Sequence, residues 1–146
     1  MWKVAIDEWQ NDGNGWLFLG IIGKKHALTK SYEDPTSYGW SLREAKKSSI
    51  REQWSCGTPR RRYEKWSGFR QGNSLYFHFK WKRLFTYNAR TNETEFTFDD
   101  IITKGRRDQY FIHFNFYNGG TKRTLETLRP EEIARMNAFF KHSRLD

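Results

Sequence analysis

The residue types that most often carry out chemistry are few in this sequence, and their spacing matches no known site. Four histidines (His26, His78, His113 and His142) have no Cys, Asp or Glu beside them at metal-ligand spacing, whereas a zinc site needs three or four convergent ligands. Cys56 would act as a nucleophile only if a histidine came to it in space. No nucleophile elbow, phosphate-binding glycine loop or H-E-x-x-H motif occurs. The sequence therefore predicts a protein that is not an enzyme and holds no metal or cofactor.

Positive charge is a stronger signal than any catalytic motif. Lysine and arginine number 26, and aspartate and glutamate number 17, which gives a net charge of +9. The densest basic group is Arg60-Arg61-Arg62, and Lys65 and Trp66 follow it closely. Basic side chains that alternate with aromatic ones can bind nucleic acid, because the cations pair with phosphates and the rings stack on bases. The same residues can instead keep an aromatic-rich β protein soluble and its strand edges unpaired, so the charge alone leaves both interpretations open.

A second candidate site begins at Tyr32. Its residues combine acids, a rigid proline and rings that can anchor a peptide, and tyrosine is a frequent binding hot spot. The candidate contact residues are Tyr32, Glu33, Asp34, Pro35 and Tyr38. The alternative is a loop whose Tyr38 and Trp40 enter the core where a strand begins.

The elements that position these residues are predicted to be short strands. Turn residues recur at short intervals, and several segments alternate apolar and polar residues. The segment 55–73 is expected to be a long surface loop, and 118–120 a hairpin turn between the last two strands. His78 and His113 are expected to be partly exposed strand residues. The expected strands are Trp16–Gly23, Tyr38–Leu42, Ser48–Trp54, Leu75–Trp81, Leu84–Asn88, Glu95–Phe98, Phe111–Phe116 and Thr121–Leu128.

Only the C-terminal end has a helical pattern. Pro130 suits a first helical position, and Glu131 and Glu132 suit the positive end of the helix dipole. Residues 130–141 are therefore expected to form a helix that packs on the sheet or on a partner. Its apolar stripe consists of Ile133, Met136, Phe139 and Phe140.

Length and composition limit the class of protein. The 146 residues suit one domain, so a single unit is expected over 1–146. An aromatic share of 18% is too high for a disordered basic tail, and the longest apolar runs are far too short to span a bilayer. No signal segment follows Met1, and a single cysteine suggests a reducing compartment. An intracellular location is expected, with the cytoplasm favoured over the nucleus.

Four segments between Trp16 and Phe116 follow one another in a characteristic order: Phe18–Ile22, Tyr38–Ser41, Gly68–Leu75 and Leu84–Asn88. This order resembles that of the SPRY family. In that family a strand that ends in a Gly-Ile step precedes a Tyr-Gly-Trp-like strand, a Gly-Asp step starts a further strand, and a hairpin of the type Leu-x-x-Tyr/Phe-Asn follows. Asn73 stands where the family usually has Asp, and the C-terminal portion matches no family pattern.

The pattern of the residues predicts an all-β fold with a short C-terminal helix, and this resemblance implies that the strands form a two-sheet antiparallel β-sandwich of jelly-roll type. It also implies a non-catalytic module that recognises a protein or peptide through loops at one edge. An acidic partner is favoured, because arginine pairs bidentately with carboxylates. The alternatives are a nucleic-acid-binding or nucleoprotein-associated protein and a carbohydrate-binding jelly roll. Carried onto this chain, the binding loops are the stretch around Tyr32 to Tyr38 and the loop with Arg60, Arg61, Arg62 and Trp66.

Overall fold

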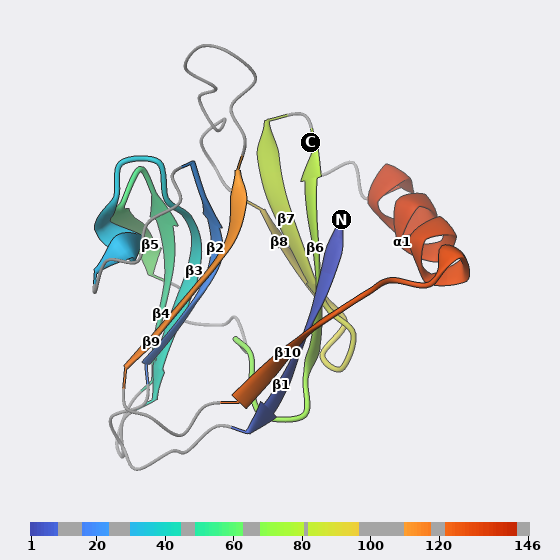
Figure 1. Cartoon of the computed structure of the whole chain (residues 1–146), viewed down its shortest axis with the longest axis horizontal. Coiled ribbons are helices and arrows are strands. Elements are labelled where there is room, and N and C mark those ends of the chain that lie inside the picture. Colours follow the sequence, from blue (N-terminus) through green and yellow to red (C-terminus); the bar gives the residue numbers. More distant parts are fainter. Residues whose placement is uncertain are drawn as a thin grey trace.

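The fold is an all-β sandwich of two antiparallel five-stranded sheets with one C-terminal helix, as predicted (Figure 1). The computed structural model describes residues 1–8, 16–23, 30–44, 49–62, 68–80, 82–96, 110–117 and 122–142. Within these residues, no helix is both long enough and apolar enough to cross a membrane.

Each sheet combines strands that are distant in the sequence. The first sheet has the order β10-β1-β6-β7-β8, and the second has the order β5-β4-β3-β2-β9. The strands of the first sheet are β1 (Trp2–Glu8), β6 (Ser74–Lys80), β7 (Arg83–Asn88), β8 (Glu93–Phe96) and β10 (Lys122–Glu126). Those of the second are β2 (Trp16–Ile22), β3 (Tyr38–Glu44), β4 (Ser49–Ser55), β5 (Thr58–Arg62) and β9 (Phe111–Tyr117).

The core lies between the sheets and follows the period of two along each strand. In β2 the alternate residues Leu17, Leu19 and Ile21 are buried in it, and Trp40 of β3 faces Phe77 of β6 at 6.3 Å between ring centroids. The remaining side chains of β2 therefore point to the outer face of the second sheet, where the candidate site lies.

Helix α1 (Pro130–His142) covers the outer face of the first sheet (Figure 1). Met136 is buried against Tyr76 and Phe85, and the Tyr76 hydroxyl donates a hydrogen bond to Glu132 Oε1 at 3.2 Å. Ile133 is 38% exposed, so the apolar stripe of the helix is buried along only part of its length.

The prediction that 55–73 is one long loop is wrong, because Thr58–Arg62 forms β5. Two central turn residues, Cys56 and Gly57, have φ angles of +53° and +69°, and the flanking residues Ser55 and Thr58 pair directly. Two consecutive positive φ angles match the twist of a two-residue hairpin. This turn was missed because Cys replaces the Asn, Asp or Gly that usually stands first in such hairpins.

Two further predictions are wrong. β9 and β10 do not form a hairpin, because β9 pairs with β2 and β10 pairs with β1 in the other sheet. Each of the two is therefore the outer strand of a different sheet. His113 is buried rather than partly exposed, whereas His78 is half-buried as expected.

Candidate binding site

The short 3-10 helix η1 (Ser31–Glu33) lies on the outer face of the second sheet, which turns an expected loop into a built surface. The Tyr32 ring lies 4.5 Å from Trp16 and 5.2 Å from Trp54, measured between ring centroids. Trp54 meets it edge-on at 86°, and Trp54 Nε1 donates a hydrogen bond to Ser41 Oγ at 2.8 Å. Edge-to-face rings attract through their quadrupoles, so these contacts hold η1 against the sheet.

A pair of glycines in the facing strands shapes the surface beneath η1. Gly20 of β2 lies directly opposite Gly39 of β3, and a methyl group at either position would meet a backbone carbonyl oxygen of the facing strand. The Phe18 ring occupies the space over Gly39, and its centroid is 6.3 Å from that of Trp54 and 5.5 Å from that of His113. The aromatic layer therefore continues from β4 to β9 without a gap.

Buried polar groups attach η1 to β9. Ser31 Oγ lies 3.1 Å from His113 Nε2 and accepts a hydrogen bond from Asn115 Nδ2 at 3.2 Å. Burial lowers the pKa of His113, and the nearby Asp34 carboxylate opposes this effect only in part. The neutral ring can accept at Nε2, so the Ser31 hydroxyl can accept from Asn115 while it donates to His113.

The chain after η1 is held by the side chain of Asp34. Asp34 Oδ1 accepts hydrogen bonds from the Thr36 backbone N–H at 2.8 Å and from the Thr36 hydroxyl at 2.5 Å. Thr36 Oγ1 in turn accepts from the Gly23 backbone N–H at 3.0 Å. Such aspartate-centred turns satisfy backbone donors locally, and here they tie the end of β2 to the approach to β3.

The turn between β4 and β5 fits closely against this segment. The Gly57 N–H donates to the Ser37 carbonyl at 3.1 Å, and a side chain at Gly57 would overlap the backbone carbonyls of Glu33 and Asp34. The positive φ of Gly57 also favours glycine. Gly57 is therefore the point at which the two predicted site regions meet, and Figure 1 shows η1 beside β5.

β5, the strand beside η1, carries two exposed arginine side chains. Pro59 lies opposite Trp54, and a register shift separates the Trp54 pairing from that of the preceding residue. Arg60 is exposed and forms no ion pair with a described residue. Arg62 is 3.5 Å from Glu52 but remains 68% exposed. We call the accessible set Tyr32, Glu33, Pro35, Arg60 and Arg62 the η1–β5 surface.

The other predicted site residues lie elsewhere. Tyr38 is buried in the core, with its hydroxyl 3.2 Å from Cys56 Sγ, so it cannot touch a partner in this structure. Trp40 is also buried, as the core interpretation predicted. Asp34 is half-buried and used in the turn. Arg61 belongs to β5, but its side chain is not described, and Trp66 lies outside the described residues.

Sequence reasoning missed the residues beneath the surface. Trp16, Trp54 and His113 were treated as ordinary strand residues, although all three form the support on which η1 rests. Gly57 was itself a local signal of this turn, because glycine favours positions with a positive φ. No local signal marks His113, since its partner Ser31 is 82 residues away.

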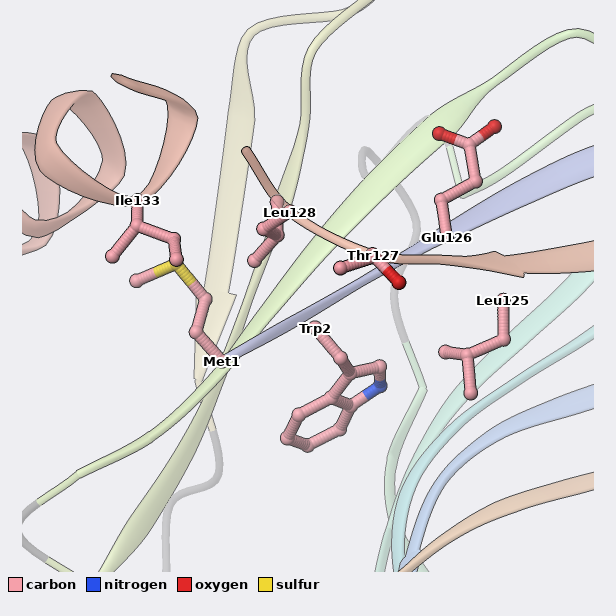
Figure 2. Close-up of a pocket in the computed structure, with 7 residues that line it drawn as sticks. All are labelled: Met1, Trp2, Leu125, Glu126, Thr127, Leu128 and Ile133. Carbon is pink, nitrogen blue, oxygen red and sulfur yellow. The ribbon is translucent and has the colours of Figure 1, made fainter. Parts of the chain in front are cut away.

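A hollow lies where β1, β10 and the start of α1 meet (Figure 2). It has a volume of about 350 Å³, and the Met1 and Ile133 side chains approach each other at one end of it. The Trp2 indole Nε1 is buried and has no hydrogen-bond partner among the described residues. Lys3 binds the Glu126 carboxylate at 2.7 Å, so the only acid in the lining is already neutralised. The lining residues are Met1, Trp2, Leu125, Glu126, Thr127, Leu128 and Ile133.

The described part of the chain contains no cluster of three or more His, Cys, Asp or Glu side chains placed to bind a metal ion. No protein-family model, no curated protein and no solved structure matches this chain. The site must therefore be interpreted from its own geometry.

Proposed function

We propose that this protein is a non-catalytic binding module that recognises an acidic protein or peptide through the η1–β5 surface. The observation that carries the proposal is the contact of Gly57 with the backbone of Glu33 and Asp34. It joins a rigidly supported aromatic turn to a strand with exposed arginines. The SPRY-like order of motifs supports the same function.

The chemistry of this surface favours a peptide with carboxylates beside an apolar or aromatic residue. Arg60 and Arg62 can each pair with a carboxylate in a bidentate manner, and Tyr32 and Pro35 supply apolar contact area with little conformational freedom to lose. Glu33 adds a negative charge at the rim, which disfavours a purely polyanionic ligand.

A binding assay with matched charge reversals tests the proposal. The probe is a fluorescently labelled peptide rich in Asp, Glu and Tyr, with a neutral peptide of the same length as reference. We expect Arg60→Glu with Arg62→Glu to weaken binding by about tenfold or more. The control, Arg70→Glu with Arg90→Glu, changes the net charge equally at two exposed arginines outside this surface. Equal losses in both double variants would show that net charge, and not this surface, binds the peptide.

Nucleic acid remains the second candidate because of the net charge of +9. A single-stranded oligonucleotide in the same assay distinguishes the two functions, because phosphate contacts release counterions and make the affinity fall steeply with salt. Oligonucleotide binding that is tighter than peptide binding at physiological salt, and steeply salt-dependent, would replace our proposal. The carbohydrate alternative needs rings on an open sheet face, whereas Tyr32 packs on the rings of this one.

A further inference from the structure

Among the strands that the structure describes, the four outermost differ in how they are protected against pairing with another chain. Three of them contain charged residues: β5 (TPRRR), β8 (ETEF) and β10 (KRTLE). β9 has the sequence FIHFNFY, with no Lys, Arg, Asp, Glu or Pro. Natural edge strands carry charges or proline to prevent edge-to-edge association, so β9 lacks the usual protection.

The side chains of β9 are exposed on both sides of the strand. Ile112 and Phe116 lie on the core-facing side of the strand, and their side chains are 36% and 41% exposed. Phe111 lies on the outer side and is 39% exposed. Exposed apolar groups on both faces of an outer strand form a surface that an added strand would cover. Figure 1 shows β9 in front of β2, at the side of the sandwich nearest the viewer.

The pattern of β9 is complementary to itself. Ile112 and Phe116 lie at equal distances in sequence from Phe114 and on the same side of the strand. In an antiparallel pair with a two-fold axis at Phe114, Ile112 opposes Phe116 of the partner subunit, and His113 opposes Asn115 of the partner subunit. Cross-strand apolar pairs of this kind stabilise sheets, and a two-fold interface uses the same surface on both copies.

We propose that the chain forms a two-fold homodimer in which β9 pairs antiparallel with β9 of a second copy. Five strands from each copy then form one continuous sheet. A second copy suits this edge because an uncharged strand avoids local repulsion between two proteins of net charge +9. A peptide of the acidic kind bound by the η1–β5 surface would find no cation on β9 to recognise it. The dimer does not depend on the proposed function of that surface.

The strength and salt dependence of this dimer follow from its size and charge. One strand pair forms a small interface, so we expect a weak dimer that dissociates within the micromolar range. Salt screens the repulsion between like net charges, and we therefore expect salt to strengthen self-association, whereas it weakens binding of an acidic peptide.

Sedimentation velocity on the whole chain, from about 5 to about 200 µM, tests the proposal. Ile112→Lys with Phe116→Lys places two lysines opposite each other and should weaken association by about a hundredfold or more. Ile112→Lys with Phe116→Glu instead places each lysine opposite a glutamate of the other copy, and should retain association within about tenfold of the unmodified chain. Ile133→Lys is the matched control, because Ile133 is 38% exposed on α1, and it should leave association unchanged.

Two readouts keep the test decisive if a β9 variant fails to fold. Thermal unfolding reports whether each variant is folded, and hydrogen exchange of the unmodified chain compares β9 amides at low and high concentration. Slower exchange of β9 amides at high concentration supports the dimer. A chain that stays monomeric at about 200 µM in high salt, or a Lys/Glu variant as monomeric as the Lys/Lys variant, overturns the proposal.

Discussion

β5 and β9 are the two outer strands of one sheet, yet their edges have opposite chemistry. β5 carries Pro59, a register shift and exposed arginines, and the turn before it is held against η1 through Gly57. β9 has no Lys, Arg, Asp or Glu, pairs regularly with β2, and has exposed apolar side chains on both sides. Proline removes a backbone donor, and a register shift bends the strand, so β5 is poorly suited to accept another strand. The proposed partner of β5 is therefore bound through side chains, whereas the proposed partner of β9 is bound through the backbone.

The largest loss of stability is expected from a change in the turn that precedes β5. We expect Gly57→Ala to lower the free energy of unfolding by about 3 kcal/mol, because a methyl group there combines a positive φ with overlap of two carbonyls. Urea unfolding followed by tryptophan fluorescence measures the loss.

Gly72→Ala is the control for backbone strain alone. Gly72 also has a positive φ, of +79°, but a methyl group there would approach only the end of the Arg90 side chain. The expected loss is about 1 kcal/mol. If both variants lose the same amount, the contact of the turn with η1 contributes nothing to stability.

Removal of the Tyr32 ring should have the next largest effect. Tyr32→Ala deletes its contacts with Trp16 and Trp54, and we expect the free energy of unfolding to fall by about 2 kcal/mol. Tyr32→Phe keeps the ring and should cost less than about 0.5 kcal/mol. A comparable loss in both variants would assign the stabilisation to the hydroxyl group instead.

A smaller effect is expected from acid at His113, on the β9 side of the sheet. Burial lowers the pKa of His113 below its usual 6.5, so the unfolded chain takes up a proton more readily than the folded protein. The free energy of unfolding should then be at its full value above pH 6.5 and decrease as the pH falls below it.

Denaturant unfolding at a series of pH values between about 8 and about 5 measures this slope. His113→Gln removes the titrating group and should flatten the curve in this range, although its stability at neutral pH is lower because the ring contact with Phe18 is lost. An unchanged slope in the variant would mean that another group causes the pH dependence.

The smallest effect is expected at an exposed arginine of β5. Arg62→Ala removes the 3.5 Å pair with Glu52, but the arginine is 68% exposed, so the free energy of unfolding should fall by less than about 0.5 kcal/mol. Binding of the acidic peptide should weaken even though stability does not change. A loss of stability above about 1 kcal/mol would make Arg62 a structural residue rather than a contact residue.

The parts of the fold that the sequence predicted are those specified by local periodicity. Alternation placed β6 and β9 nearly at their observed bounds, and a short continuous apolar run did the same for β2. The proline and glutamates of 130–132 placed the start of α1. These signals depend on neighbouring residues in the chain, so they survive without knowledge of the tertiary structure.

The errors arose where distant residues decide the structure. β5 is rich in arginine and contains a proline, and it becomes a strand because β4 lies beside it. The last two strands were predicted to form one hairpin because a turn sequence joins them, but their pairing partners lie at least 89 residues away in the chain. Leu17 pairs with Phe116, and Ala5 pairs with Thr124. The burial of His113 depends on Ser31 and Phe18 in the same way.

The position of η1 has a consequence for how the two edges respond to ligands. Tyr32 packs on Trp54 beside β5, while the preceding residue, Ser31, is bonded to His113 and Asn115 of β9. A ligand that pulls Tyr32 from its place also weakens the bonds of Ser31 to β9. Thermodynamic reciprocity then requires that an added strand which rigidifies β9 makes the displacement of Tyr32 costlier by the same free energy. Through η1, the two proposed sites would therefore be coupled, so that a ligand bound at one edge changes the affinity of the other.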